Sequence, residues 1–330
     1  MPRQPRLDTP GALHHVMGRG IDGIKIFRNK NDCEDFLSRL KALSEKKALS
    51  VYAWALMDNH FHLLVRTGKS SLSDSMRKLL TGYVVNYNRR HKRYGHLFQN
   101  RYKSILCEDD PFLLELTRYI HLNPLRAGIV RDMNELRRYD RCGHSVILGK
   151  IYRPWQDSET ILAYFGKRRK AATEKYEKYV EDGIKAGNRL ELVGGGLIRS
   201  LGGWSQVLSL KRTGSKIYSD ERILGGSDFV KKAIKDAEKK EKETLRLNQR
   251  ISDLVSLAGR ICKGESVDIS DLCSGIRKKD VVRSRKIFCQ LAVKKMGYSG
   301  AEIARFLGIT TSAVNRLAES DRLNNFKDYL

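Results

Sequence analysis

The sequence is short of acidic residues and has no long apolar run. Its 330 residues include 38 Asp and Glu against 63 Lys and Arg, which gives a formal net charge of +25. The apolar runs are far shorter than the roughly 20 residues of a membrane-spanning helix, and no charged and then apolar leader is recognisable. We therefore expect a cytoplasmic protein without a membrane partner. The positive charge is spread over the whole chain, which favours nucleic acid over a membrane surface as the partner.

Closely spaced cysteines are also missing. The six cysteines are widely separated: Cys33, Cys107, Cys142, Cys262, Cys273 and Cys289. No two stand at the spacing of a zinc cluster or a redox motif. We expect reduced thiols, because a disulfide framework belongs to exported proteins.

Hydrophobic periodicity predicts an α+β domain at the N-terminus. Strands are expected over 12–17, 49–56, 60–66 and 105–107, and helices over about 31–47, 71–93 and 111–123. This order is that of a ferredoxin-like βαββαβ fold with one added helix. Asn31 is the expected cap of the first helix. Pro124 is expected to end the last one, because proline disfavours helical geometry at the residue before it.

The rest of the chain divides into two parts. Glycine clusters and the charged run 231–242 mark residues 131–245 as an intermediate region and linker without assignable chemistry. Helical periodicity returns in residues 246–330, where Gly308 separates two short helices at the spacing of a helix-turn-helix. We therefore expect three parts, with the α+β domain in residues 1–130.

Two histidines that flank one apolar residue, His60 and His62, are candidate metal ligands. Side chains two apart on a strand share a face, so both imidazoles face away from Phe61. A polar core would show the same pattern. Tyr119 and Asn123 are four apart and share a helical face. Two imidazoles and one carboxamide would form an open site that suits Mg²⁺ or Mn²⁺ with phosphate oxygens and water, whereas structural zinc requires four closed ligands.

Other histidines and tyrosines have simpler interpretations. His14 and His15 are adjacent, so they face opposite ways on a strand, and we interpret them as structural or DNA-facing. Tyr83 and Tyr87 belong to an apolar helical stripe and are expected in the core. Tyr102 lies between two basic residues, where stacking on a base or contact with the nucleic-acid backbone is expected.

Taken together, these motifs resemble the single-tyrosine HUH transposases, and most closely the REP-associated tyrosine transposases. The resemblance covers roughly residues 11–130. It depends on His-Phe-His at 60–62, Gln-Asn-Arg-Tyr-Lys-Ser at 99–104 and Tyr-Ile-His-Leu-Asn-Pro at 119–124. It implies a metal-dependent endonuclease and strand transferase that acts on hairpin-forming single-stranded DNA through a 5′-phosphotyrosine intermediate.

The resemblance also assigns roles to residues. Tyr119 would be the nucleophile, and His60, His62 and Asn123 would hold Mg²⁺ or Mn²⁺. Apart from these roles, the basic residues near the expected site, Arg19, Arg101 and Lys103, are candidate DNA contacts, and a solvated surface charge is the alternative for each. A catalytically weak DNA-binding regulator and an HUH-type replication initiator remain alternatives, and the chain is expected to be a monomer or a homodimer.

The C-terminal part resembles the DNA-binding domain of the replication initiator DnaA over roughly residues 248–320. The similarity lies in residues 281–286 and 298–314. It breaks after Gly308, where no Asp-His pair precedes the threonines, so duplex DNA binding is expected but the initiator's target sequence is not. If the last helix reads the groove, the contacts are Thr311, Ser312, Asn315 and Arg316. A helical domain that binds a protein partner is the alternative.

Overall fold

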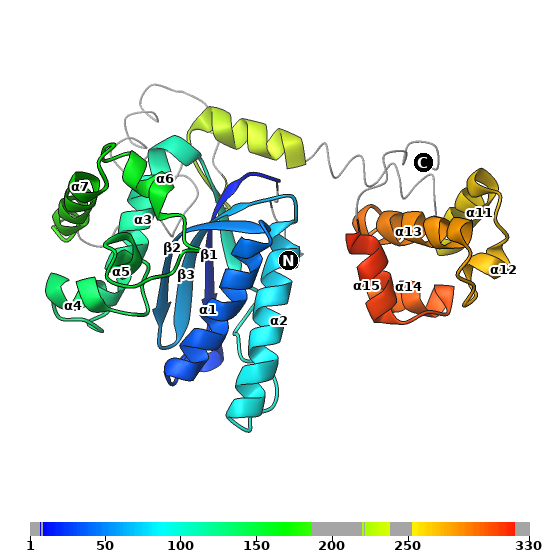
Figure 1. Ribbon diagram of the computed structural model, residues 1–330, viewed down its shortest axis with the longest axis horizontal. Coiled ribbons are helices and arrows are strands. Elements are labelled where there is room, and N and C mark those ends of the chain that lie inside the picture. The colour runs from blue at the N-terminus through cyan, green and yellow to red at the C-terminus, as the bar shows by residue number, and fades with distance from the viewer. Residues whose placement is uncertain (1–6, 8, 186–219, 221, 238–252, 321–330) are drawn as a thin grey trace. The chain divides into compact units, whose positions relative to one another are not determined.

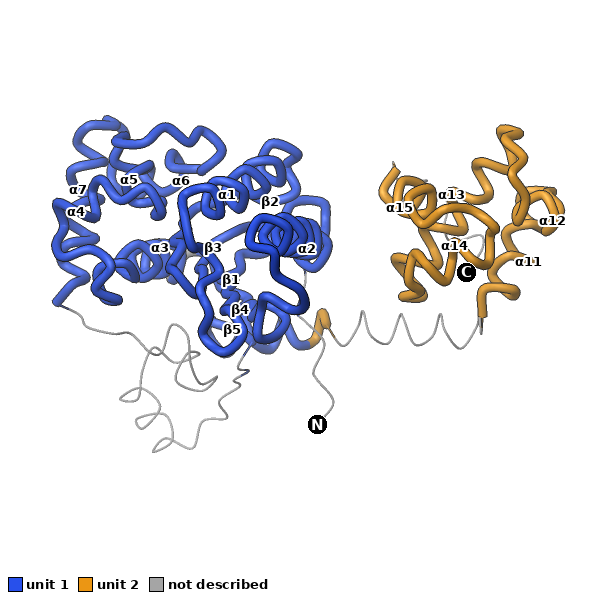
Figure 2. Tube along the Cα trace, turned by 90° about the horizontal axis from the view of Figure 1, so that it is seen from below, with its two compact units in different colours: residues 1–234 blue, residues 235–330 orange. Residues whose placement is uncertain are grey.

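The chain forms two compact units, unit 1 (1–234) and unit 2 (235–330) (Figures 1 and 2). The computed structural model describes residues 7, 9–185, 220, 222–237 and 253–320, with the backbone alone at 110–111. Most of the glycine clusters of the predicted linker lie outside the described residues. Residues 227–237 are helical, and this segment contains the start of the charged run 231–242.

Unit 1 is organised around a five-stranded sheet. Its strands are β1 (Leu13–Arg19), β2 (Leu49–Met57), β3 (His60–Thr67), β4 (Lys103–Cys107) and β5 (Ile223–Leu224), with a 3-10 turn, η1 (Ile21–Gly23), after β1. The strand order is β2-β3-β1-β4-β5, in which β5 pairs parallel with β4 and the other pairs are antiparallel. The predicted order of strands and helices is observed. The sequence did not show β5, because two residues carry no periodic signal.

Helices cover both faces of this sheet. α1 (Lys30–Glu45) and α2 (Leu72–Arg90) lie on one face, and α3 (Asp109–Arg126) lies on the other (Figure 1). Side chains alternate along β3, so Phe61 is buried in the core under α1 and α2 while Leu64 is buried in the core under α3. The structure is therefore α+β, as the periodicity predicts.

Two helix ends differ from the sequence prediction. α1 is capped by Asn29, whose side chain accepts a hydrogen bond from Asp32 N, and the predicted cap Asn31 lies inside the helix. α3 continues through Pro124 to Arg126. Pro124 has no N–H to donate to the helical ladder, but the hydrogen bond from Ala127 N to Asn123 O, at 2.9 Å, closes the last turn.

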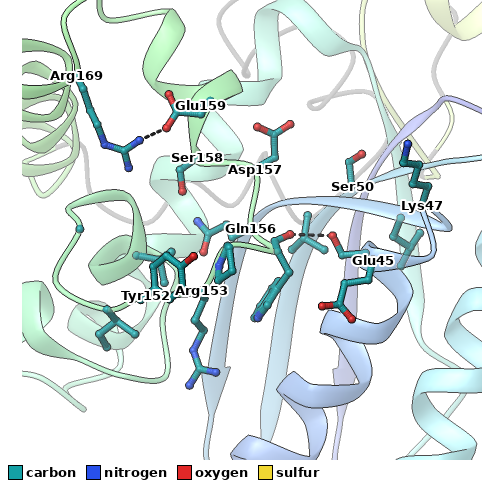
Figure 3. A pocket seen from close by; sticks show the side chains of 18 residues that line it. Glu45, Lys47, Ser50, Tyr152, Arg153, Gln156, Asp157, Ser158, Glu159 and Arg169 are labelled. Atoms are coloured by element: carbon teal, nitrogen blue, oxygen red, sulfur yellow. Dashed lines mark hydrogen bonds and ion pairs between the residues drawn. The ribbon is translucent and has the colours of Figure 1, made fainter.

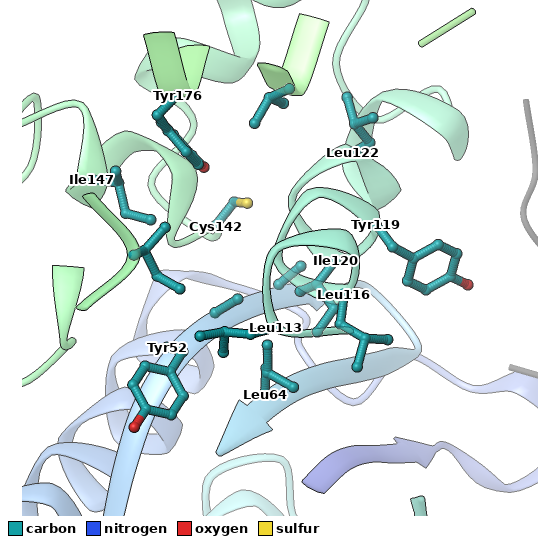
Figure 4. Close-up of a cluster of buried hydrophobic side chains, with 14 of the residues drawn as sticks. Tyr52, Leu64, Leu113, Leu116, Tyr119, Ile120, Leu122, Cys142, Ile147 and Tyr176 are labelled. Carbon is teal, nitrogen blue, oxygen red and sulfur yellow. The ribbon is translucent and has the colours of Figure 1, made fainter. Parts of the chain in front are cut away.

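Residues 130–182 pack onto the sheet domain. Their helices are α4 (Met133–Arg138), α5 (His144–Ile147), α6 (Ser158–Ala163) and α7 (Arg169–Asp182). They bury Leu136, Cys142 and Tyr176 in the cluster around α3. Figure 4 shows Cys142 and Tyr176 in this cluster. The predicted boundary at residue 130 therefore falls inside one compact unit, because the apolar side chains that follow it complete the core of the preceding domain.

The same segment covers the free edge of β2. Leu56 N donates to Arg141 O at 2.8 Å, and Asp157 N donates to Val51 O at 2.8 Å. These bonds satisfy backbone groups that an edge strand would otherwise expose.

Unit 2 contains helices only within its described residues. They are α11 (Leu254–Glu265), α12 (Ile269–Leu272), α13 (Lys279–Lys294), α14 (Gly300–Leu307) and α15 (Thr311–Glu319). Phe288 is buried and stacks on Phe306, with ring centroids 5.4 Å apart. Gly308 ends α14 at φ 64°, a left-handed conformation that glycine adopts without strain. Thr310 caps α15, so the predicted pair of short helices with a glycine turn is present.

None of the described helices is long and apolar enough to cross a membrane. All six cysteines are within the described residues, and each is a free thiol.

Candidate functional site

His60 and His62 lie on one face of β3, as strand alternation predicts. In the pairing with β1, Met17 is opposite His62 and Arg19 is opposite His60. The two imidazole centroids are 5.3 Å apart. His62 is buried, whereas His60 is partly exposed. The pair therefore lies on the face of the sheet that α3 covers, at the point where this face becomes exposed to solvent.

A third histidine, His15, joins this pair from β1. Its Nε2 lies 3.0 Å from Nδ1 of His62, within hydrogen-bond distance, and the two rings stack with centroids 5.2 Å apart. The sequence interpretation did not place His15 at the site. Its position depends on which strands are neighbours, since β1 and β3 pair so that His15 shares the face of His62. Adjacent His14 is buried toward the other face, as alternation requires.

The hydrogen bond of His60 fixes which of its ring nitrogens can bind a metal. His60 Nδ1 lies 2.7 Å from Asn59 Oδ1. A carboxamide oxygen only accepts, so His60 Nδ1 carries the proton and Nε2 keeps its lone pair. Burial and the charge of Arg19 lower the pKa of His60, and burial, His15 and His60 lower the pKa of His62 well below its usual value. Both imidazoles are therefore neutral near pH 7, the form that binds metal ions.

Tyr119 approaches the histidines from α3. Its ring centroid is 6.0 Å from those of His15 and His62, edge-on to each. Figure 4 shows its side chain leaving α3 on the side away from Tyr176. Burial raises the pKa of the phenol, and the guanidinium of Arg126, 5.4 Å from the ring centroid, lowers it.

Asn123 lies one helical turn beyond Tyr119 and is partly buried. Its amide nitrogen is buried and has no hydrogen-bond partner in the described part of the chain. No three His, Cys, Asp or Glu side chains of the described residues converge as a metal site. The ligands that the sequence predicts, His60, His62 and Asn123, would supply two imidazoles and one carboxamide, whose oxygen and nitrogen exchange places by a half-turn. Such a set leaves positions for phosphate oxygens and water, which suits Mg²⁺ or Mn²⁺.

A cleft of about 400 Å³ opens beside the histidines. It brings together five residues that the sequence singled out, which are His60, His62, Arg19, Arg101 and Lys103. The three cations are exposed. Neither Tyr119 nor Asn123 is among the described residues that line the cleft. Both belong to α3.

Residues 99–101 form one wall of the cleft. Ile21 N donates to Leu97 O and Gln99 N donates to Arg19 O, both at 3.0 Å, so this segment runs beside the end of β1. The position of Tyr102 does not fit the stacking on a base or contact with the nucleic-acid backbone that the sequence predicts. It is buried in the core under α1 and α2. Tyr83 and Tyr87 are buried in the same core, as predicted.

Gly18 is required by a close approach within the site. A Cβ at this position would lie 2.5 Å from the ring of Phe61, the partner of Gly18 in the sheet. The absence of a side chain lets β1 and β3 stay paired as far as Arg19 and His60, at the rim of the cleft.

A larger cleft of about 950 Å³ lies at the edge of β2 (Figure 3). None of the residues singled out from the sequence lines it. Its charged side chains carry both signs and several are paired, as in the contact between Arg169 and Glu159. A polyanion gains little from such a balanced surface, so the histidine cleft is the better candidate site.

In unit 2, the residues predicted to face a DNA groove are all exposed on α15. They are Thr311, Ser312, Asn315 and Arg316. Their spacing places them on one side of the helix, opposite buried Val314 and Ala318. Contact with DNA stays a prediction for all four.

Residues 12–123 match the family described as "Transposase IS200 like". The match covers about a third of the chain and contains every unit 1 residue that the sequence singled out. A solved structure of a REP-associated tyrosine transposase bound to a REP hairpin is also similar, with 13% sequence identity and a TM-score of 0.36 over 47% of this chain and 90% of that chain. No curated protein matches the chain. The N-terminal part of the chain is therefore similar to transposases of the IS200 type.

Proposed function

We propose that the protein is a metal-dependent single-strand DNA endonuclease and strand transferase, a transposase that acts on hairpin-forming DNA in the cytoplasm. The observation that carries this proposal is the position of Tyr119, 6.0 Å from the rings of both His15 and His62. A phenol beside neutral imidazoles, next to a cleft rimmed by cations, suits nucleophilic attack on a phosphodiester. The match to IS200-like transposases over residues 12–123 supports the same function.

The proposed reaction forms one bond and breaks one. The Tyr119 oxygen attacks the phosphorus, the bond from phosphorus to the 3′ oxygen breaks, and the strand is left with a 5′-phosphotyrosine. The phenol loses one proton and the leaving 3′ oxygen gains one, so the step is balanced. Because the ester retains the energy of the broken bond, another 3′-hydroxyl can attack it and rejoin the strand.

Three side chains would hold the metal ion. These are His60 and His62, through Nε2, and Asn123, through its carboxamide. A bound Mg²⁺ or Mn²⁺ would polarise the scissile phosphate. His15 holds the ring of His62 through the 3.0 Å contact, and an outer partner of this kind fixes the orientation of a ligating histidine.

Positively charged residues would hold the strand and help the phenol to ionise. Arg19, Arg101 and Lys103 rim the cleft and are placed to contact phosphates, which fixes the register of the strand without reading its sequence. Arg126 lies over the ring of Tyr119 and opposes the rise in the phenol's pKa that burial causes. Its guanidinium would stabilise the negative charge that develops on the oxygen during attack.

The helical unit 2 would bind duplex DNA. The support is its pair of short helices, α14 and α15, with the exposed polar face of α15. The resemblance to the DnaA DNA-binding domain points the same way. A helical domain that binds a protein is the alternative, and a monomer and a homodimer are both compatible with this proposal.

A second candidate function is a DNA-binding regulator with weak chemistry. It is favoured by the raised pKa of Tyr119, because a phenol with a raised pKa gives up its proton less readily than a free tyrosine does. A regulator would keep the basic cleft and the exposed face of α15 but would not form a covalent DNA adduct.

Adduct formation separates the two functions. Hairpin oligonucleotides labelled on the 3′ side and carrying an unpaired extension are incubated with the protein and Mn²⁺, and the products are run on a denaturing gel. The transposase forms a labelled protein band that resists denaturation. Tyr119→Phe removes this band, while Tyr152→Phe, a control at a tyrosine that is 88% exposed, keeps it. A parent protein that binds the hairpin without any adduct identifies the regulator, and an adduct in Tyr119→Phe assigns the nucleophile elsewhere.

A further inference from the structure

The loop that follows α2 exposes an aromatic side chain almost completely. Tyr94 is 92% exposed, more than any other large apolar side chain of the described residues. A single exposed aromatic residue is ordinary on a protein surface. Three further features indicate that this ring binds a ligand: the local backbone, the charge around the ring and the connection of the loop to the cleft.

The backbone of this loop is held in place by hydrogen bonds. Arg93 N donates to Asn88 O at 2.8 Å, Asn88 Nδ2 donates to Gly95 O at 3.0 Å, and the Arg93 guanidinium donates to His96 O at 2.9 Å. Lys92 and Gly95 adopt positive φ angles of 49° and 82°. The backbone that carries Tyr94 is therefore already ordered, and little backbone conformational entropy is lost when a flat ligand stacks on the exposed ring.

The surface around Tyr94 is positively charged. Arg89 and Lys92 are exposed and form no ion pair within the part of the chain that the structure describes. The nearby carboxylate of Asp32 is already engaged, since it is 2.8 Å from Arg90 and 2.9 Å from His91. An exposed aromatic ring beside cations without anionic partners is the arrangement that binds single-stranded nucleic acid.

The loop leads directly into the cleft. Tyr94 is five residues before Gln99, the first residue of this segment that lines the cleft. Five residues of extended chain span at most about 17 Å, so a strand that occupies the cleft can reach Tyr94 within a few nucleotides. Leu97 and Gln99 are fixed to the end of β1 by their backbone hydrogen bonds, which keeps this path in place.

We infer that Tyr94 is a stacking platform for unpaired bases of the DNA strand held in the cleft, with Lys92 and Arg89 beside the phosphates. The identity of the partner rests on the proposed function. The strand must be unpaired at this point, because the faces of bases inside a duplex are already covered by their neighbours. Stacking needs no particular base, so the platform adds affinity for the strand without specifying its sequence.

The test is a binding measurement in EDTA, so that no cleavage takes place. Fluorescence anisotropy is used with two labelled hairpins, one blunt and one with an unpaired extension. Tyr94→Ala should bind the extended hairpin about 5- to 100-fold more weakly and the blunt hairpin as the parent does. Tyr94→Trp should restore the affinity, because an indole also stacks. Tyr152→Ala serves as the matched control at another exposed tyrosine.

Salt dependence separates stacking from charge. Lys92→Gln should reduce the slope of log affinity against log salt by about one, because one phosphate contact is lost. Tyr94→Ala should leave that slope unchanged, because stacking releases no counterions. Equal affinity of Tyr94→Ala and the parent for the extended hairpin overturns the inference, as does an equal loss for both hairpins.

Failure of this inference is distinguishable from failure of the proposed function. If the parent forms no covalent adduct but Tyr94→Ala still weakens binding of the extended hairpin alone, the platform stands and the transposase does not. If the parent forms the adduct and Tyr94→Ala binds both hairpins as the parent does, only the platform is wrong.

Discussion

At the scale of single residues, His15 sets the state of a neighbouring imidazole. The 3.0 Å contact between His15 Nε2 and His62 Nδ1 occupies one nitrogen of each ring. If His62 donates this bond, its Nε2 keeps a lone pair for a metal, and His15 acts as a neutral acceptor in the place where many metal sites have a carboxylate. A neutral partner adds no negative charge, so a metal held by His62 would keep more of its own charge to polarise a phosphate.

Substitution of His15 should therefore weaken metal binding before any reaction takes place. In His15→Phe the ring remains but the acceptor is lost, and we expect Mn²⁺ affinity to fall about 10- to 100-fold. His15→Gln retains an acceptor and should recover part of the loss. Electron paramagnetic resonance of free Mn²⁺ measures the affinity of the protein without DNA.

The matched control is His96→Gln, which changes an exposed histidine of the loop after α2. It should leave Mn²⁺ affinity at the parent value. Unchanged affinity in His15→Phe would show that His15 only fills space beside His62.

The sequence predicted some of these residues and not others for a physical reason. The shared face of His60 and His62 follows from local strand geometry, which the sequence contains. The place of His15 depends on the pairing of β1 with β3, residues more than forty positions apart. The burial of Tyr102 depends in the same way on which helices cover its face of the sheet. The roles assigned to Tyr119 and Asn123 stay predictions.

At the scale of elements, α3 is tied to α7 by a buried polar network. Tyr176 on α7 places its hydroxyl 2.6 Å from Nδ1 of His121 and 3.0 Å from Nδ1 of His144. A hydroxyl donates one hydrogen bond and accepts others, so one histidine must accept and the other donate. His121 is two residues from Tyr119, and the network therefore helps to hold the helix that carries the proposed nucleophile.

This network should make the folded protein sensitive to acid. Burial, with a smaller contribution from Arg137, lowers the pKa of His144 to about 3, whereas an unfolded histidine has a pKa of about 6.5. Between these values the unfolded chain binds a proton that the folded chain does not. Stability should therefore fall as the pH drops from about 6.5 toward about 3, by roughly 1.4 kcal/mol per pH unit for His144 alone.

Urea denaturation at pH 7.5 and pH 5.0 measures this effect. The free energy of unfolding should be lower at pH 5.0, and His144→Gln, which removes the titrating ring, should show a smaller difference between the two pH values. His96→Gln, at an exposed position, should show the same difference as the parent. An equal pH dependence in His144→Gln and the parent would mean that His144 is protonated in the folded state.

Element boundaries were predictable where local signals decide them. The helix predicted from residue 71 begins there, with Ser71 as its cap, because a side-chain acceptor at a helix start is a local feature. The continuation of α3 through Pro124 and the packing of residues 130–182 onto α3 depend on tertiary contacts. Apolar residues such as Leu136 show in the sequence that a core exists but not which core they join.

At the scale of the whole molecule, the charge of +25 is shared by two compact units. If the unit 1 cleft holds a single strand and unit 2 holds a duplex, the two interactions act on one DNA molecule. Binding by one unit then raises the effective concentration of DNA at the other. A variant that has lost DNA binding in one unit should therefore bind a hairpin joined to a duplex more weakly than the parent does. Its binding to the DNA piece recognised by the other, intact unit alone, either the hairpin or the duplex, should change less.

The face of α15 provides the last prediction. Arg316→Gln in the full chain should weaken binding to a linear duplex and reduce the slope of log affinity against log salt by about one, because one phosphate contact is lost. Adduct formation on a short hairpin should stay unchanged, since that reaction uses unit 1. The control is Arg283→Gln. Arg283 lies on α13 and not on α15, and it already pairs with Glu265 of α11. Duplex affinity that stays unchanged in Arg316→Gln and in a second variant, Asn315→Ala, would remove α15 as the reader, and the alternative of a protein-binding helical unit would then be favoured.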